Sequence, residues 1–300
     1  MNTFERLDGV YRKAKKVTFD EHSKLVFVSD CHRGDDSISD EFARNQTLML
    51  AALQYYYDQG YTYVEAGDGD ELIEYGNFQN IRSAHIDVLT VLKEFYKEHR
   101  FYMLYGNHNL FLRHPEYVRK NYYYYFDEYL EEQRALFPNL HVYEGILLRY
   151  KPNNQKILVV HGHQGDLMND QLWLVSLILL RYFWRFVHVV GFKNPSSPAR
   201  NQFKQHKIEK IYSRWLESND LMLICGHTHR LKFPKEGDLP YFNTGCCIHT
   251  KGITVLEILE GKIMIVQWRI VADKKGVLRT QRTIIRGPEY IEKYQRTPKR

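Results

Sequence analysis

The chain has 300 residues, of which 44% are apolar and 26% are charged, and its net charge is +6. This composition excludes an intrinsically disordered chain, and the length is sufficient for one large domain or two small domains with a sizeable core. The positive charge is compatible with anionic substrates or a negative membrane surface, but it is too small to favour nucleic acid as the partner.

The first 20 residues predict an N-terminal helix, because Phe4, Leu7 and Tyr11 recur at the spacing of one helical face. Residues 1–20 contain neither an apolar core nor a small-residue cleavage site, so we do not expect a signal peptide. The four cysteines of the chain follow no regular spacing and make no disulfide framework. Reduced thiols in the cytosol are the simplest interpretation.

Strand-like and helix-like segments alternate through the first half of the chain, which favours an α/β layer architecture. Buried strands are predicted at residues 25–29, 61–65 and 101–105. One helix is predicted from about Asp40 to Gln59, with Ser39 as its N-cap and Gly60 just beyond its end. A second helix is predicted at residues 83–99, where the apolar residues line one helical face.

A long helix is predicted from Pro115 through Arg134. It contains the aromatic run Tyr122–Tyr125, which we interpret as a half-buried face; an aromatic wall for a ligand is the alternative. The pattern then becomes strand-rich, with strands predicted at residues 157–160, 221–225, 241–243, 253–258 and 262–270. Residues 272–300 form a basic, polar tail that we expect on the surface or partly mobile.

An insertion at residues 166–219 separates two of these strands and predicts a helical cap, with helices at residues 170–190 and 198–216. In the first helix, Arg181, Arg185 and His188 form a basic stripe among apolar faces, so we do not expect it to span a membrane. Such a cap could lie on a membrane surface or cover an acyl chain; a packed helix with locally paired arginines is the alternative. We expect residues 1–300 to form a single domain.

Five short polar blocks follow predicted buried strands, and they carry the chemistry of the chain. The blocks are Asp30-Cys31-His32, Gly67-Asp68-Gly69-Asp70-Glu71, Gly106-Asn107-His108-Asn109, His161-Gly162-His163 and Gly226-His227-Thr228-His229. Ligands at the C-terminal ends of successive strands converge on one crevice. We therefore expect the blocks to assemble one site for two adjacent metal ions.

Carboxylates, histidines and one amide suit a hydrolytic site in which a metal-bridging hydroxide attacks phosphorus while both ions absorb the developing charge. The candidate ligands of the first ion are Asp30, His32 and His229. The candidate ligands of the second ion are Asn107, His161 and His227. Asp68 is the candidate that bridges both ions. These ligand types admit manganese, iron or zinc, so the sequence leaves the metal open.

In order, the five blocks resemble the calcineurin-like metallophosphoesterase superfamily, whose pattern is D-x-H, G-D-x-x-D/E, G-N-H-D/E, a histidine often followed by glycine, and G-H-x-H. The resemblance spans residues 30–229, and all five blocks in this order make a specific match. It implies a four-layer α/β/β/α sandwich with a dinuclear site at the strand ends. With the insertion predicted above, we expect this sandwich to carry a helical cap insertion.

The resemblance also implies a catalytic role for His108, which in relatives contacts the scissile phosphate or protonates the leaving oxygen. The family usually has an acidic residue after this histidine, whereas this chain has Asn109, which we also expect to be catalytic. A carboxylate orients an imidazole and favours its charged form, but an amide can only orient it. We therefore expect a weaker general acid at neutral pH. Asp70 and Glu71 are expected to order the metal loop.

Four residues are candidates for contact with the substrate: Arg33, His163, Arg181 and Arg185. Arg33 follows the first block and could meet a substrate phosphate, with a surface salt bridge as the alternative. His163 is expected behind the ligands or against the substrate, with a purely structural histidine as the alternative.

The placement of the cap is similar to the helical lid of the UDP-diacylglucosamine pyrophosphatases. That branch typically carries an arginine after the asparagine of the third block, where this chain has His108, so a phosphomonoesterase or phosphodiesterase of related architecture stays open. We expect a cytoplasmic phosphohydrolase, peripheral to the inner face of a membrane or free of it, that acts on a lipid-linked or nucleotide substrate. A nuclease and a non-catalytic binding scaffold are the alternatives.

Overall fold

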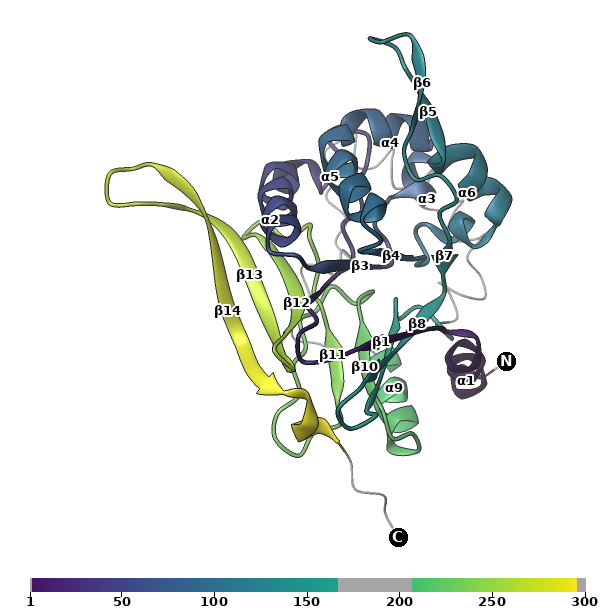
Figure 1. The fold of residues 1–300 in the computed structure, drawn as a ribbon, viewed down its shortest axis with the longest axis vertical. Coiled ribbons are helices and arrows are strands. Elements are labelled where there is room, and N and C mark those ends of the chain that lie inside the picture. Colours follow the sequence, from purple (N-terminus) through teal and green to yellow (C-terminus); the bar gives the residue numbers. More distant parts are fainter. Residues whose placement is uncertain (1, 167–206, 296–300) are drawn as a thin grey trace.

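The computed structural model describes residues 2–166 and 207–295, and its strands form two sheets and one separate hairpin (Figure 1). The larger sheet has seven strands in the order β14-β13-β12-β2-β3-β4-β7. Their bounds are β14 Leu278–Tyr290, β13 Lys262–Ala272, β12 Ile253–Leu259, β2 Leu25–Val28, β3 Thr62–Ala66, β4 Phe101–Leu104 and β7 Val142–Tyr143. Strands β2, β3, β4 and β7 are parallel, whereas β12, β13 and β14 continue the sheet in antiparallel fashion.

The smaller sheet has five strands in the order β1-β8-β9-β10-β11. Their bounds are β1 Lys15–Phe19, β8 Gly145–Tyr150, β9 Lys156–Val160, β10 Met222–Cys225 and β11 Tyr241–Asn243. Strands β9, β10 and β11 are parallel, so their C-terminal ends lie at one edge of this sheet. The hairpin consists of β5 Tyr124–Asp127 and β6 Glu132–Ala135.

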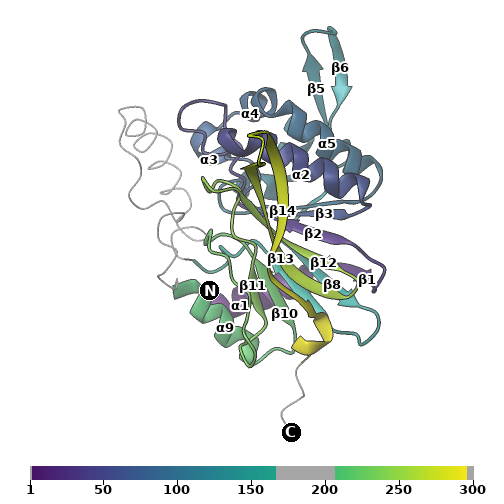
Figure 2. The same cartoon turned by 90° about the vertical axis from the view of Figure 1, so that its left-hand side faces the viewer.

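Helices cover the outer face of each sheet, so the fold has four layers, α/β/β/α (Figures 1 and 2). The described helices are α1 Thr3–Lys13, α2 Gln46–Asp58, α3 Leu72–Tyr75, α4 Phe78–Ala84, α5 Ile86–Lys97, α6 Pro115–Tyr122 and α9 Lys207–Glu217. Short 3-10 helices lie at Ala43–Asn45, Leu110–Arg113 and Ile291–Tyr294. Among the described residues, no helix has both the length and the apolar character needed to cross a lipid bilayer.

The core between the two sheets is built by alternate residues of the central strands. Phe27 of β2, Val64 of β3 and Val159 of β9 belong to this inter-sheet cluster. Their neighbours point the other way, as Val26 does toward the cluster that includes α2 and α5. Because both faces are covered, the central strands are runs of apolar residues, which is why the sequence revealed them.

Several predicted boundaries differ from the structure. The segment 1–20 holds both α1 and strand β1. The helix predicted from Asp40 begins only at Gln46, because Asp40 accepts hydrogen bonds from the backbone N–H groups of Phe42 and Ala43 and forms a turn first. The helix predicted at residues 83–99 is divided at His85 into α4 and α5.

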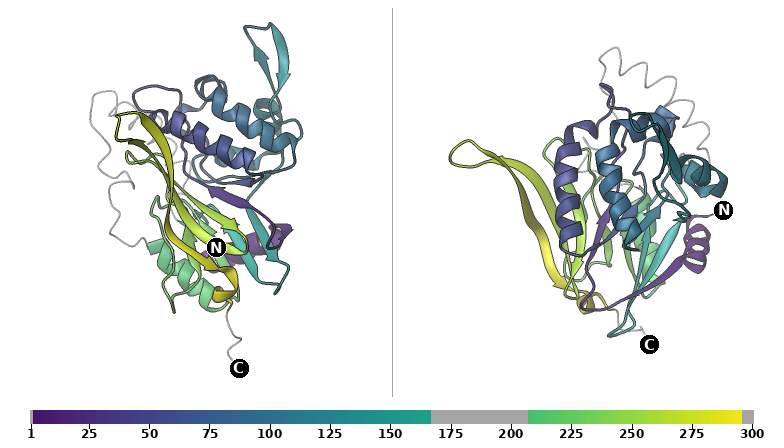
Figure 3. Two further views of the ribbon diagram at one scale, coloured as in Figure 1. Left: turned by 60° about the vertical axis from the view of Figure 1, so that its left-hand side comes forward. Right: turned by 45° about the horizontal axis from the view of Figure 1, so that its top comes forward.

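The prediction of one helix through Arg134 is wrong. Helix α6 ends at Tyr122, and the following aromatic residues form the β5–β6 hairpin, which extends away from the sandwich (Figure 3). Aromatic side chains favour strands, and the run has no helical periodicity to oppose this preference. The hairpin is anchored where the N–H groups of Leu136 and Phe137 donate to the carbonyls of Tyr123 and Tyr122.

Much of the segment 272–300, predicted to be a polar tail, is a strand, because residues Leu278–Tyr290 form β14. Strand β14 pairs with β13 along almost its whole length, and the two form a long ribbon (Figure 1). The charged residues of this segment led to the prediction of a tail. A strand in an exposed ribbon needs few apolar residues, so its sequence pattern is weak. In the predicted cap, the helix at residues 170–190 lies outside the described residues. Helix α9 overlaps the later part of the predicted second cap helix, but Tyr212 and Trp215 pack it against the smaller sheet, so this part is an outer helix of the sandwich.

Candidate metal centre

The five polar blocks meet at one edge of the sandwich. Asp30 follows β2, Asp68 follows β3, His161 follows β9 and His227 follows β10, so the C-terminal ends of parallel strands from both sheets converge there. The first two blocks are joined directly, because the N–H groups of Asp30 and His32 donate to the carbonyls of Gly67 and Asp68, at 3.1 and 2.9 Å.

Five predicted ligands have a left-handed backbone conformation. Their φ angles are 53° for Asp30, 47° for His32, 52° for Asp68, 68° for His227 and 53° for His229. Residues with a Cβ rarely adopt this conformation, and such strain concentrates at functional sites. The strand ends therefore turn sharply, which brings side chains that are two residues apart to the same site.

The first group of candidate ligands contains Asp30, His32 and His229. His229 Nε2 lies 3.1 Å from Asp30 Oδ1 and 3.1 Å from His32 Nε2. His32 Nδ1 lies 2.7 Å from Glu71 Oε2. When Nδ1 donates its proton to this carboxylate, Nε2 keeps a lone pair that faces the other two ligands.

The second group contains Asp68, His161 and His227. His161 Nε2 lies 2.8 Å from Asp68 Oδ2, and His161 Nδ1 donates to the carbonyl of Ala66 at 3.0 Å. The backbone bond therefore leaves the Nε2 lone pair directed at the Asp68 carboxylate. Asn107 is buried in the same turn as His108, whose N–H donates to Asp68 Oδ1 at 2.8 Å.

The two groups are linked, because the His227 N–H donates to the Asp30 carboxylate at 3.0 Å. Asp68 is also close enough to His32 and His108 to affect the pKa of each histidine. Asp68 belongs to the second group and also influences a ligand of the first group, and its role as the bridging ligand stays a prediction.

This donor set fits divalent cations. In each group a carboxylate oxygen and imidazole lone pairs face one another, and a buried cation or extra protons must lie between them. Burial tends to raise the pKa of Asp30, but His229 and His32 outweigh it and hold this pKa well below its usual value. Burial tends to lower the pKa of His161, but the Asp68 carboxylate outweighs it and raises this pKa. The lowered pKa of Asp30 favours its ionised carboxylate, which is the form that binds a metal.

The predicted catalytic histidine has a carboxylate partner after all. His108 Nδ1 lies 2.5 Å from Glu71 Oε2, and the His108 side chain is 24% exposed, so it is more open than the ligands around it. Burial tends to lower the pKa of His108, but Glu71 and Asp68 outweigh it and raise this pKa. The expectation of a weaker general acid, which rested on the amide of residue 109, therefore loses its physical basis.

Asn109, predicted as catalytic, has a different role. It is fully buried, and its Oδ1 accepts a hydrogen bond from the N–H of Gly106 at 2.6 Å. This bond closes the turn that carries Asn107 and His108. The residue that contacts the His108 ring is Glu71, which lies in another loop at the third position after Asp68. The sequence pattern predicts only that Glu71 orders the metal loop.

Arg33, predicted to meet a substrate phosphate, is fully buried. Its guanidinium donates to both carboxylate oxygens of Glu65, at 3.0 and 2.8 Å, and to Asp70 at 2.7 Å. A buried cation requires such partners, and they leave no side for a substrate. Arg33 instead fastens the first ligand block to the second.

His163 is fully buried beside the second group, with its ring centre 5.5 Å from that of His161. Neither ring nitrogen has a hydrogen-bond partner among the described residues. Burial, together with His161 and His227, lowers its pKa well below the usual value. His163 thus lies beside the second group, and whether it also meets the substrate stays a prediction. The other two predicted substrate contacts, Arg181 and Arg185, lie outside the described residues.

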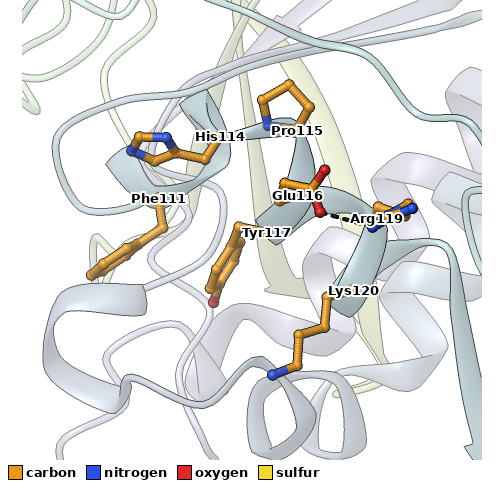
Figure 4. Close-up of a pocket in the computed structure, with 7 residues that line it drawn as sticks. All are labelled: Phe111, His114, Pro115, Glu116, Tyr117, Arg119 and Lys120. Atoms are coloured by element: carbon orange, nitrogen blue, oxygen red, sulfur yellow. Dashed lines mark hydrogen bonds and ion pairs between the residues drawn. The ribbon is translucent and has the colours of Figure 1, made fainter.

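A surface hollow of about 810 Å³ lies on the segment that follows the third block (Figure 4). It is lined by Phe111, His114, Pro115, Glu116, Tyr117, Arg119 and Lys120. The rings of Phe111 and Tyr117 stack with their centres 5.6 Å apart. None of the described residues that line the hollow is a candidate metal ligand, so it is separate from the metal centre.

Comparison with known families gives one match: the profile described as calcineurin-like phosphoesterase matches residues 23–231. No curated protein matches the chain. Among solved structures, the chain is similar to Vps29 from Cryptosporidium parvum at 13% identity, with a TM-score of 0.35, over 88% of this chain and 97% of that one. It is also similar to wild-type Vps29 complexed with Zn²⁺ from Entamoeba histolytica, at 16% identity and a TM-score of 0.37, over 87% and 98% of the two chains.

Proposed function

Because the chain belongs to the calcineurin-like phosphoesterase family and is a metal-dependent phosphoesterase, we propose that it hydrolyses a phosphoester or pyrophosphate bond with two divalent ions. The observation that carries this proposal is the contact between His108 and Glu71 beside the two ligand groups. It joins an oriented acid to the metal centre, which is the pair of components that such a hydrolysis needs.

Each of the two ligand groups would bind one ion. Asp30, His32 and His229 would hold one ion, and Asn107, His161 and His227 would hold the other, with Asp68 shared. The bound ions would supply Lewis acidity toward the phosphoryl oxygens and a nucleophilic water at neutral pH. Manganese, iron and zinc are all suited to this mixture of imidazole and oxygen ligands.

The protein itself would supply the proton for the leaving oxygen. Glu71 contacts His108 through Nδ1, so Nε2 is the nitrogen available to a substrate. The raised pKa of His108 favours the protonated imidazole, which can donate to an oxygen that leaves phosphorus. After donation, the Glu71 carboxylate favours the return of a proton to the ring.

For the substrate we propose a lipid-linked or nucleotide phosphate or pyrophosphate. The support is the sequence of residues 166–219, an amphipathic segment whose Arg181 and Arg185 suit a phosphate and whose apolar residues suit an acyl chain. This segment would also make any peripheral contact with a membrane. A nuclease would instead require a continuous basic groove and salt-sensitive binding.

The test is metal reconstitution followed by a substrate panel. Chelated protein would be loaded with manganese, iron or zinc and assayed on phosphomonoesters, phosphodiesters, a pyrophosphate-linked lipid and single-stranded DNA. We expect turnover that depends on metal and is lost in Asp68→Asn. Turnover of DNA alone would favour the nuclease. Binding of the metals without turnover of any substrate would favour a non-catalytic scaffold.

A further inference from the structure

Two β-arms extend from the sandwich (Figures 1 and 2), and neither contains a candidate metal ligand. The first, here called the acidic hairpin, comprises residues 124–135 of β5, β6 and their turn. The second, here called the basic ribbon, comprises residues 269–286, the distal part of β13 and β14. Each arm combines exposed apolar side chains with charges of a single dominant sign.

The acidic hairpin has four acidic residues and one basic residue. The basic residue, Arg134, lies 3.7 Å from Asp127 and 3.5 Å from Glu132. The large apolar side chains are strongly exposed, at 48% for Tyr124, 58% for Phe126, 99% for Tyr129 and 56% for Leu130. Four such side chains on one short hairpin are more than the scattered exposed apolar residues of an ordinary surface.

The basic ribbon has six basic residues and one acidic residue. The acidic residue, Asp273, lies 3.0 Å from Arg279. Ile270 and Val277 are each 50% exposed, and Leu278 is 69% exposed.

The exposed apolar residues of the ribbon continue a face that is buried nearer the core. Trp268 pairs with Arg282 across the strands, and its indole N–H donates to Tyr56 of helix α2. Cross-strand partners share a face, so the pairs Ile270–Thr280 and Ala272–Leu278 lie further along the same face. Among residues 2–166 and 207–295, nothing covers this distal part as α2 covers Trp268.

The charges along the exposed strand edges favour one of the three possible contacts between two copies of the chain: ribbon with ribbon, hairpin with hairpin, or hairpin with ribbon. β14 is the outermost strand of its sheet, and the hairpin has only two strands, so both arms present backbone edges. If β14 paired with β14 of a second copy, arginines would meet arginines, and if two hairpins paired, carboxylates would meet carboxylates. Such like-charge contacts are a device that prevents edge association. Contact between a hairpin and a ribbon brings opposite charges together.

From this complementarity we propose that the partner of both arms is a second copy of this chain. The acidic hairpin of one copy docks against the basic ribbon of the other, and the two-fold axis repeats the contact in reverse. Both contacts then use the same two surfaces, as a closed two-fold dimer requires. An anionic membrane or nucleic acid would account for the ribbon alone, and it would repel the hairpin.

Sedimentation velocity on the full chain, over a range of concentration and salt, tests this proposal. We expect a dimer of two 35.9-kDa chains at low salt that dissociates as salt rises, because the contact is partly electrostatic. The hairpin variant Glu131→Lys/Glu132→Lys and the ribbon variant Lys274→Glu/Lys275→Glu should each be monomeric, with the dimer dissociation constant raised at least about tenfold. A mixture of the two variants should form more dimer than either variant alone, because one of its two contacts is the wild-type contact and in the other the new lysines face the new glutamates.

The matched controls are Glu236→Lys and Lys235→Glu, exposed charge reversals in a loop outside both arms, which should leave the dimer unchanged. Phosphoesterase activity should persist in all variants, which shows that they fold. A monomeric wild type at every concentration, or arm variants that remain dimeric, would overturn the proposal. Flotation of a monomeric wild type with phosphatidylglycerol vesicles, lost in Lys274→Glu/Lys275→Glu, would assign the ribbon to a membrane instead.

Discussion

His108 and Glu71 come from loops that follow different strands, and their side chains meet with His108 Nδ1 2.5 Å from Glu71 Oε2. The same carboxylate oxygen lies 2.7 Å from His32 Nδ1. Glu71 therefore orients one candidate metal ligand and the candidate acid at once. A single carboxylate couples the two halves of the proposed chemistry, which makes it the most informative residue to change.

Replacement of Glu71 by glutamine should lower kcat about 100-fold on a substrate with a poor leaving group, because the loss removes the charge that favours protonated His108. The loss should be much smaller for a nitrophenyl ester, whose leaving oxygen needs little protonation. Steady-state kinetics on an alkyl and a nitrophenyl phosphate measure this difference. Metal content must be measured in parallel, since Glu71 also contacts His32.

His108→Asn provides the matched comparison, because it removes the acid and leaves Glu71 in contact with His32. The two variants should show the same dependence on the leaving group if Glu71 acts through His108. Equal losses on both substrates, with reduced metal content in Glu71→Gln, would instead assign Glu71 to the metal centre alone.

Arg33→Met should destabilise the fold by about 3–5 kcal/mol, because it leaves the buried carboxylates of Glu65 and Asp70 without their cation. Urea unfolding followed by fluorescence gives the free energy of unfolding. Arg119→Met is the control, since Arg119 forms an exposed ion pair with Glu116 and should change stability by less than about 1 kcal/mol. Similar effects of the two substitutions would contradict the structural role of Arg33.

The ligand blocks could be predicted from the sequence, whereas the contacts between blocks could not. Asp30, Asp68 and His161 follow apolar strands, and parallel strand ends meet by the topology of the sheet. The partner of His108 depends on how two loops fold back on each other, and no local pattern distinguishes Glu71 from Asn109 for that task. The prediction that Arg33 contacts a substrate phosphate failed for a similar reason. The sequence around an arginine does not show whether it is buried or exposed, because that depends on partners in other loops.

The hairpin at residues 124–135 illustrates a second limit. Tyr125 packs against the core cluster, whereas Tyr124 and Phe126 on either side of it are exposed. Aromatic residues therefore occupy both faces of β5, and the sequence lacks the alternation of apolar and polar residues that marks a half-buried strand. Helix α6 runs directly into it, and only the strand preference of the tyrosines marked the change. Segments that do not pack on the core carry the weakest structural signal in a sequence.

Gly106→Ala should lower kcat/KM about 100-fold, because the added Cβ would overlap Oδ1 of the proposed bridging ligand Asp68. Metal content and steady-state kinetics measure the effect. Gly9→Ala in α1 is the control: its Cβ would meet no atom within 4 Å, and alanine favours a helix. Unchanged metal content and activity in Gly106→Ala would show that the turn has room for a side chain.

The buried pair of Asp40 and His85, 2.8 Å apart, should make stability depend on acidic pH. Burial tends to raise the pKa of Asp40, but His85 outweighs it and lowers this pKa. A lowered folded-state pKa stabilises the fold above the unfolded-state pKa of about 3.9, and this contribution is lost as pH falls through the folded-state pKa.

In Asp40→Asn this part of the acid dependence should disappear. The two hydrogen bonds that Asp40 accepts from the N–H groups of Phe42 and Ala43 should also weaken, because the acceptor loses its charge. Chemical unfolding at a series of acidic pH values measures the slope of the free energy of unfolding. Asp87→Asn, in the first turn of α5, is the control. A steeper acid dependence in Asp40→Asn than in the wild type would show that the sign is wrong.

Metal binding should release protons at neutral pH. Burial tends to lower the pKa of His32, but Asp30 and Glu71 outweigh it and raise this pKa well above its usual value, while Asp68 raises that of His161. These raised pKa values favour a second proton on both histidines in metal-free protein, and a cation would have to displace such a proton to reach the ring nitrogen. The affinity for the metal should accordingly fall as pH decreases.

Calorimetric titration of chelated protein with manganese, in two buffers of different ionisation enthalpy, counts the protons released. His114→Gln, an exposed histidine outside both ligand groups, should release as many as the wild type, whereas His161→Asn should release fewer. Binding with no proton release would mean that these histidines are neutral before the metal arrives, and that the close contacts within each group are not held by protons.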